Sequence, residues 1–224
     1  MTETVFDPRV IDAKDWATYL FVFSFALIAI TRTAFETRFN DFLKILVSDK
    51  YIKVYKDPSH LMSGFTILLF VVQTISFAFF IQLALSHFGY VSKTDWLLFI
   101  RIFTFLGVFV LSKFLIEKII ATVFNIEEFA EQLNLQKVSY RTYVSMLLLP
   151  FNIYLFYNES SSNTLLICII CVILAINVYT YLVSLKIYQN LLISKMFYFI
   201  LYLCALEIAP YYFIYYLITK NLAH

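Results

Sequence analysis

The chain has 224 residues, of which 62% are hydrophobic and only 14% are charged, and its formal net charge is +2. An average soluble domain is about 45–50% apolar and about 25% charged, so the composition excludes an ordinary soluble domain. Lipid admits only helices and closed barrels as spanning structures. Strict two-residue alternation, the pattern typical of a barrel, is absent from the sequence. The predicted fold class is therefore an all-α polytopic membrane protein.

Six apolar segments are long enough, or nearly so, to cross a hydrocarbon core, which requires about 20 residues. In chain order, the predicted spans cover residues 16–31, 61–85, 96–115, 140–157, 164–183 and 196–218. The first and fourth are the shortest. Six spans leave little chain for a soluble domain, so residues 1–224 are expected to form a single transmembrane domain.

Lys and Arg are distributed unequally between the loops. Twelve of the 17 belong to the loops after the first, third and fifth spans, and four belong to the opposite side. Cytoplasmic loops are enriched in Lys and Arg. The richer side is therefore predicted to be cytoplasmic, and both termini are predicted to be periplasmic.

The first long loop has the periodicity of an amphipathic helix over about residues 33–47. Its apolar positions and the charged residues between them are Phe35, Phe39, Phe42, Leu43 and Leu46, with Arg38, Asp41 and Lys44. This pattern predicts a helix that lies on the cytoplasmic leaflet, with its bases facing anionic lipid. The alternative is a helical extension of the first span.

The second long loop carries apolar residues at steps of 4, 3, 4 and 3 from Ile119 to Leu133. Its flanks are acidic, and an acidic face is repelled by anionic lipid. A separate helix here would therefore pack on protein. The alternative is that the pattern continues the third span, because no helix-breaking residue separates the two.

An Asp-Trp pair opens both the first and the third span, as Asp15-Trp16 and Asp95-Trp96. One interpretation is a parallel internal repeat, a device common in transporters. The other is a helix N-cap followed by an aromatic anchor at the membrane interface.

Two charged side chains lie inside predicted spans and away from the cytoplasmic ends, where Lys113 and Arg141 are counted with the loops. Glu207 is 11 residues from either end of the sixth span, and an intramembrane carboxylate is a candidate functional group. Pro210 is expected to kink that helix and to free a carbonyl beside Glu207. Glu207 is then either a structural contact that fixes helix packing or a proton carrier. Arg101 either snorkels to the outer surface or forms an ion pair with Glu207.

Neutral polar residues also occur inside the spans, namely Gln73, Gln82, Asn152 and Asn177. Side chains of this kind usually form hydrogen bonds between membrane helices, so we interpret them as packing contacts. Pro150 in the fourth span is predicted to kink that helix.

The sequence contains no motif that indicates catalysis. The chain has three glycines and no phosphate-binding glycine loop, no His-Glu-x-x-His motif and no Gly-x-Ser-x-Gly motif. Cys168 and Cys171 lie in a purely apolar run and are interpreted as small packing residues. We therefore predict no catalytic residue, no metal site, no cofactor and no nucleic-acid partner.

Four stretches together resemble a known family: Asp15-Trp16, Leu20-Phe21-Val22-Phe23, the basic stretch that ends at Tyr51, and Leu147-Leu148-Leu149-Pro150. The chain resembles an uncharacterised family of polytopic inner-membrane proteins from Bacteroidota, known as a domain of unknown function. The resemblance covers nearly the whole chain. It implies a helical fold in the bacterial inner membrane and no known activity.

Small size, two amphipathic cytoplasmic stretches and the lack of a catalytic motif favour a non-enzymatic subunit or accessory factor of an envelope complex, for protein export, secretion or assembly. Its expected partners are the lipid bilayer and other membrane proteins. The alternative is a small transporter or proton-linked channel that uses Glu207. A lipid-modifying membrane enzyme is the least favoured hypothesis.

Overall fold

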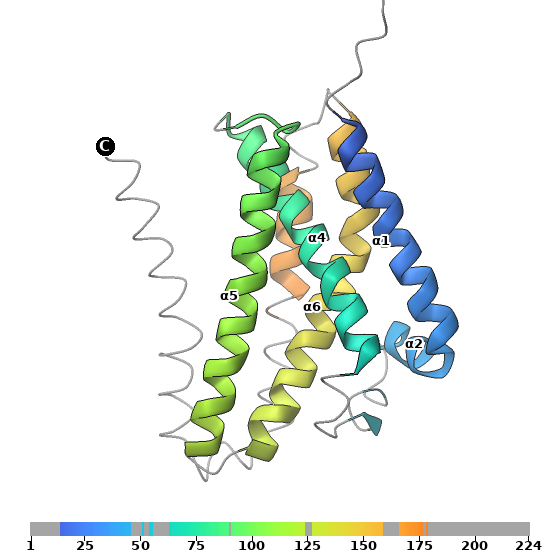
Figure 1. Cartoon of the computed structure of the whole chain (residues 1–224), viewed down its shortest axis with the longest axis vertical. Helices are drawn as coiled ribbons and strands as arrows, with labels where there is room; N and C mark the ends of the chain where they lie inside the picture. Colours follow the sequence, from blue (N-terminus) through green and yellow to red (C-terminus); the bar gives the residue numbers. More distant parts are fainter. Residues whose placement is uncertain are drawn as a thin grey trace, which may run out of the picture.

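The structure is a computed structural model, and it describes residues 14–45, 51, 54–55, 63–89, 91–123, 127–158, 166–176 and 178. All regular structure in these ranges is helical (Figure 1). The helices are α1 (Asp15–Ala34), α2 (Glu36–Leu43), α4 (Gly64–His87), α5 (Trp96–Val123), α6 (Glu127–Tyr157) and a short apolar helix, Leu166–Ile176. The predicted all-α class is confirmed.

Three of these helices are long and apolar enough to cross a membrane: α1 with 20 residues, α4 with 24 and α5 with 28. They coincide with the first three predicted spans. The fourth predicted span is the C-terminal part of α6, and only Leu166–Ile176 and residue 178 of the fifth are described. The sixth lies outside the described residues. Six transmembrane helices therefore remain a prediction.

The acidic stretch between the third and fourth predicted spans does not form one separate helix. Its beginning extends α5 as far as Val123, and its end opens α6 at Glu127. α6 is consequently 31 residues long, with a polar N-terminal half and an apolar C-terminal half. The interpretation as a continuation of the third span is thus correct for the first half of the stretch only.

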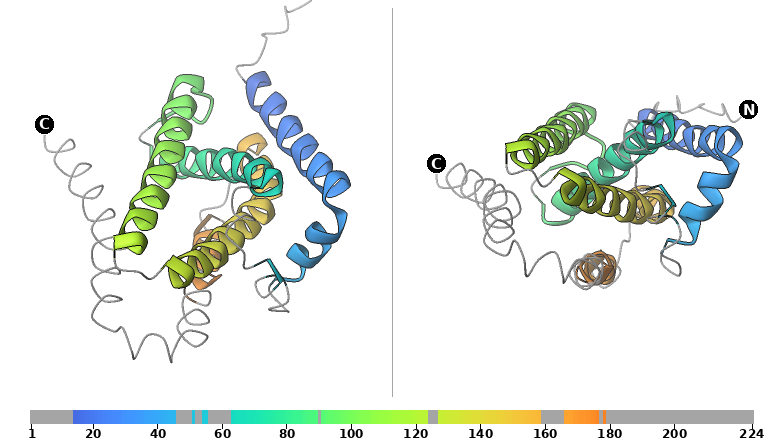
Figure 2. Two further views of the ribbon diagram at one scale, coloured as in Figure 1. Left: turned by 60° about the horizontal axis from the view of Figure 1, so that its bottom comes forward. Right: turned by 90° about the horizontal axis from the view of Figure 1, so that it is seen from below.

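α4 is the central helix of the described bundle. It packs against α1, α5 and α6, and Figure 2 shows it between α1 on one side and α5 on the other. In its most apolar window, 56% of the residues are buried, compared with 6% in α5. A helix that is apolar all round can be buried in a protein interior, and α4 is the helix that takes this place.

The core near the start of α1 is aromatic and draws on four helices. Phe79 of α4 lies 4.3 Å from Phe21 of α1 and 4.6 Å from Phe99 of α5, between ring centroids. Phe156 of α6 closes the cluster with an edge-to-face contact. Such pairs contribute about 0.5–1.5 kcal/mol each beyond the burial of their area, so this cluster holds one end of the bundle together.

Candidate functional site

The two most conspicuous predicted residues, Glu207 and Pro210, lie outside the described residues, so their roles stay predictions. Arg101 is on α5 with an exposed side chain, and its ion pair with Glu207 also stays a prediction. Pro150 lies inside α6, and helical residues continue on both sides of it.

The amphipathic stretch of the first loop forms a shorter helix than predicted. α1 extends to Ala34, and α2 follows after Phe35 and ends at Leu43. The side chains of Phe39 and Phe42 are buried, that of Phe35 is half-buried and that of Lys44 is exposed. Leu46 lies outside the described residues. The apolar face of α2 thus packs on protein, against Phe65 of α4 and Tyr140 of α6 among others.

Arg38, expected among the bases that face lipid, is instead buried, with 7% of its surface exposed. Its guanidinium donates from Nη1 to Ser63 Oγ at 2.6 Å and from Nη2 to Thr66 Oγ1 at 3.3 Å. It also lies 4.5 Å from the ring centroid of Phe65 and 5.1 Å from that of Tyr55. Arginine favours such planar stacking combined with several donors. Arg38 therefore joins α2 to the start of α4.

Tyr51 completes this cluster. Its hydroxyl accepts a hydrogen bond from Nε of Arg38 at 3.4 Å, and its ring contacts Phe42 edge to face. Burial raises the pKa of Tyr51 above its ordinary value of 10.0, and the nearby Arg38 charge opposes that rise. Sequence periodicity did not indicate this cluster, because Ser63 and Thr66 follow Arg38 by 25 and 28 residues.

A buried polar seam joins α4 to α6. Thr142 Oγ1 donates to Gln73 Oε1 at 2.9 Å, and Ser76 Oγ donates to the carbonyl of Ser145 at 2.7 Å. Farther along, Asn152 Nδ2 donates to the carbonyl of Ser76 at 2.8 Å. The interpretation of Gln73 and Asn152 as packing contacts is confirmed, since both bond across the helix interface.

Gln82 makes the corresponding contact at the end of α4. Its Nε2 donates to the carbonyl of Asp95 at 2.8 Å and to that of Lys93 at 3.3 Å. Oδ1 of Asp95 in turn accepts a hydrogen bond from the backbone N–H of Leu98 at 3.2 Å, so Asp95 is the N-cap of α5. The N-cap interpretation is therefore correct for Asp95. Asp15, by contrast, lies in the first turn of α1, where no side-chain cap forms.

A second set of buried polar groups belongs to the halves of α5 and α6 that lie away from the aromatic core. Lys113 and Glu117 are buried one turn apart on α5, and Gln136 is buried on α6. Within the described part of the chain, Glu117 Oε1 and both amide atoms of Gln136 have no hydrogen-bond partner. The i, i+4 spacing of Lys113, Glu117 and Ala121 was a usable signal of a buried face, but the predicted third span ended at residue 115, before Glu117 and Ala121.

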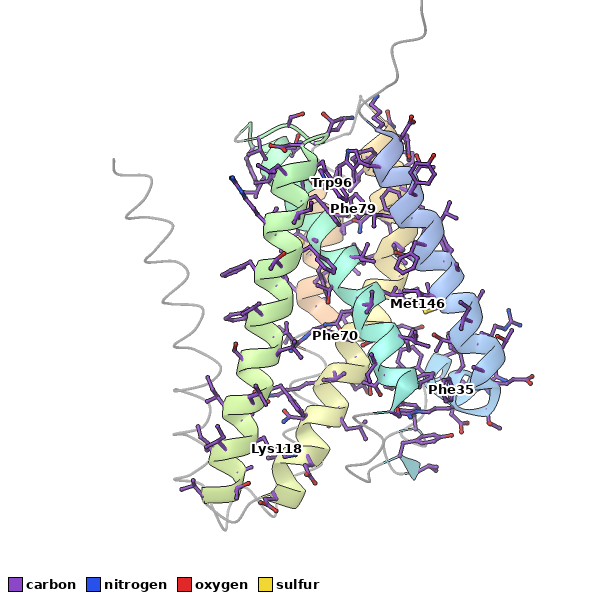
Figure 3. The ribbon with its side chains drawn as sticks, viewed as in Figure 1. Phe35, Phe70, Phe79, Trp96, Lys118 and Met146 are labelled. Carbon is purple, nitrogen blue, oxygen red and sulfur yellow. The ribbon has the colours of Figure 1, made fainter. Side chains whose placement is uncertain are left out.

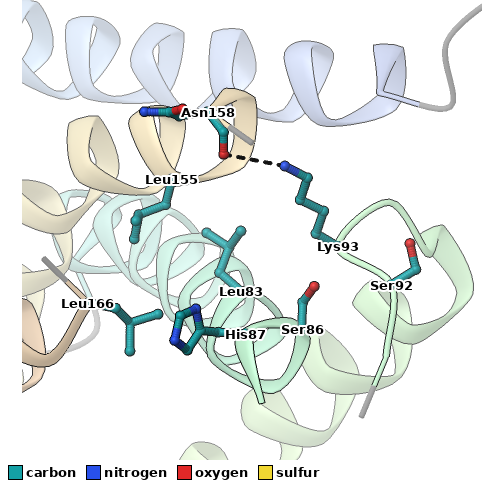
Figure 4. Close-up of a pocket in the computed structure, with 8 residues that line it drawn as sticks. All are labelled: Leu83, Ser86, His87, Ser92, Lys93, Leu155, Asn158 and Leu166. Carbon is teal, nitrogen blue, oxygen red and sulfur yellow. Dashed lines mark hydrogen bonds between the residues drawn. The ribbon is translucent and has the colours of Figure 1, made fainter. Parts of the chain in front are cut away.

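One cavity, of about 380 Å³, lies where α4, α6 and the short apolar helix come together (Figure 4). Its lining residues are Leu83, Ser86, His87, Ser92, Lys93, Leu155, Asn158 and Leu166. Lys93 Nζ donates to the carbonyl of Asn158, another lining residue, at 3.4 Å. None of these residues stood out in the sequence, because they come from four separate segments.

The described residues contain no group of three or more His, Cys, Asp or Glu side chains that could hold a metal ion. The polar clusters described above are the Arg38 cluster, the buried groups of the helix interfaces and the lining of the cavity.

The family described as "Domain of unknown function (DUF4271)" matches residues 17–218, which is most of the chain. No curated protein and no solved structure matches the chain.

Proposed function

We propose that this chain, which belongs to the DUF4271 family, is a non-enzymatic subunit or accessory factor of an envelope complex in a bacterial inner membrane. The observation that carries the proposal is that the polar side chains of the central helix α4 form hydrogen bonds within the chain. Gln73, Ser76 and Gln82 all bond to neighbouring segments of the chain. Buried polar groups that bond between helices specify packing and rigidity, which is what a structural subunit requires.

α5 is the helix that we infer to contact a partner. It is long and apolar enough to cross a membrane, yet only Phe99, Lys113, Glu117 and Ala121 are buried among its 28 residues. Most of its exposed side chains are large and apolar; Val108, for example, is 60% exposed. In a bilayer such a face contacts either acyl chains or a transmembrane helix of another protein. We propose the latter for part of its length.

Co-purification of the full chain in a mild detergent tests the proposal. We expect a partner protein at fixed stoichiometry. A photo-reactive residue at Val108 should cross-link to that partner, and the same residue at Val22 of α1, which is 63% exposed, serves as the position control. A monodisperse homo-oligomer without a second protein, and without cross-links from α5, would contradict the proposal.

The alternative function is a small transporter or proton-linked channel that uses Glu207. The observation that favours it is the buried pair of incompletely bonded groups, Glu117 and Gln136, since a buried polar group without a partner is costly unless water or an ion reaches it. Reconstitution of the full chain into vesicles that contain a pH-sensitive dye tests this function. Proton flux that is lost in Glu207→Gln would support it.

A further inference from the structure

We propose that the cavity at the shared end of α4 and α6 binds an anionic group, a phosphate or a phosphodiester, through Lys93 and His87. The binding of the anion does not depend on the proposed subunit role. If the anion is the headgroup of a lipid, however, the proposal also requires that α4 and α5 cross the bilayer.

The lining has the chemistry that such an anion requires. Lys93 and His87 are the ionisable residues among those that line the cavity, both are basic, and Ser86 and Ser92 add hydroxyl donors. An ammonium and two hydroxyls can form charge-assisted and neutral hydrogen bonds to phosphate oxygens. The volume of about 380 Å³ is within the range of small-ligand pockets.

The opposite wall is apolar and suits the non-polar part of an amphiphile. Leu83 of α4, Leu155 of α6 and Leu166 of the short helix form it, and Figure 4 shows all three on the side of the cavity away from Lys93 and Ser92. Figure 4 places His87 beside Leu166, and Lys93, Ser86 and Ser92 on the other side. A cavity with an ammonium and two hydroxyls on one side and mainly leucines on the other matches a lipid headgroup with the start of its acyl chains. A free phosphate would use the polar side alone.

The cavity lies at the end of the bundle that holds both tryptophans of the chain. Trp16 Nε1 donates to the carbonyl of Thr94, the residue after Lys93, at 3.3 Å, and the rings of Trp16 and Trp96 lie 5.0 Å apart. Tryptophan is enriched at the level of lipid headgroups. Figure 3 shows Trp96 near this end and Lys118 near the other end of α5.

Lys93 also has a structural role at the end of α6, and the experiment must separate this role from anion binding. Its Nζ donates to the carbonyl of Asn158, directly after α6, and basic side chains stabilise helix C-termini by their charge. An ammonium carries three N–H donors, however, so one bond to a carbonyl leaves donors for an anion.

The test uses the full chain in a non-ionic detergent, titrated with dihexanoyl-phosphatidylglycerol, with dihexanoyl-phosphatidylcholine and with inorganic phosphate. Binding is followed by calorimetry and by the fluorescence of Trp16 and Trp96. We expect saturable binding of the anionic lipid. Removal of one charge-assisted contact in Lys93→Gln should weaken it about tenfold, whereas Lys93→Arg should retain it. Lys118→Gln, the same change at the far end of the bundle, should leave binding unchanged.

The titrants distinguish the two sources. Tight binding of the anionic lipid with little effect of inorganic phosphate identifies a headgroup site, and saturation by inorganic phosphate with no gain from the lipid identifies a free-anion site; both support the proposal. Equal binding of all probes by wild type and Lys93→Gln would overturn it. So would a lower melting temperature of Lys93→Gln with unchanged affinity, because Lys93 would then only stabilise the end of α6.

Discussion

At the scale of single residues, Arg38 has the most specific surroundings among the charged side chains of the described chain. Three of its nitrogens donate to hydroxyl oxygens, and three aromatic rings surround the guanidinium. A buried charge is tolerated only where hydrogen bonds replace its water. The surroundings of Arg38 therefore predict a large effect of substitution, although the residue belongs to a helix of only eight residues.

We expect Arg38→Met to lower the free energy of unfolding by about 2–3 kcal/mol, because hydrogen bonds to a charged group contribute about 1.5–3 kcal/mol and their partners are left unpaired. Arg38→Lys should recover only part of the loss, since lysine cannot reproduce the planar fork. Thermal denaturation in detergent measures the effect. The matched control is Arg32→Met on the exposed side of α1, and an equal loss in this control would contradict the prediction.

Tyr51 should make stability depend on alkaline pH. Its pKa in the folded chain is raised by burial above 10.0, so the folded state holds the phenol proton more tightly than the unfolded state. The resulting stabilisation is complete below pH 10 and is lost as pH rises through the folded-state pKa. The free energy of unfolding, measured as a function of pH, should fall less steeply above pH 10 in Tyr51→Phe than in wild type. Identical slopes would show that Tyr51 does not contribute to the pH dependence of stability.

For Glu207 we expect Glu207→Gln to retain folding and complex formation, because the amide preserves the volume and most hydrogen bonds of a protonated carboxyl group. Melting temperature and recovery of the partner in co-purification are the measurements. If complex formation survives but a proton flux of the wild type disappears, the transporter hypothesis replaces the proposed function.

At the scale of elements, the central position of α4 explains how a strongly apolar helix can carry polar residues. Gln73, Ser76 and Gln82 lie on a helix whose neighbours supply a partner for each of them. α5 lacks such surroundings, and only 6% of its apolar window is buried. The two helices are almost equally apolar, so their different environments come from their places in the bundle.

A double-mutant cycle on Gln73→Met and Thr142→Val should give a coupling energy of about 0.6 kcal/mol and no more than about 1.7, the range for hydrogen bonds between membrane helices. Pairing Gln73→Met with Thr104→Val provides the control, because Thr104, within the described part of the chain, bonds to Ile100 of its own helix. A coupling energy near zero for Gln73 and Thr142 would contradict the proposal that the polar seam stabilises the packing of α4 on α6. An equally large coupling energy for the control pair would also contradict it.

At the scale of the whole molecule, the helices alternate in direction as successive crossings would. The start of α1 meets the loop between α4 and α5 through the bond from Trp16 to Thr94, and the end of α5 and the start of α6 lie together at the opposite end (Figure 1). This arrangement agrees with the predicted order of the first crossings. Which end faces the cytoplasm is a prediction from the Lys and Arg distribution alone.

We expect both termini to be periplasmic. A reporter that is active only in the periplasm should therefore be active when fused after His224, and a reporter that is active only in the cytoplasm should be active when inserted in the loop near Lys44. The reverse pattern would overturn the predicted orientation.

The sequence by itself determined the helical class and the places of α1, α4 and α5, because the length of an apolar run and a capping residue such as Asp95 act locally along the chain. It also indicated that Gln73 and Asn152 form packing contacts, since a polar side chain within an apolar run needs a partner wherever it lies.

Only the tertiary structure decided which residues meet. It buried Arg38 among Ser63, Thr66 and Phe65, turned Lys113 and Glu117 inward, and brought His87 and Lys93 to one cavity. The contacts of Arg38 span 25 and 28 residues of sequence, and the cavity combines His87 and Lys93 with Leu155 and Asn158. Hydrophobic periodicity describes one helix at a time and does not specify which neighbour covers which face, so sequence reasoning could not predict them.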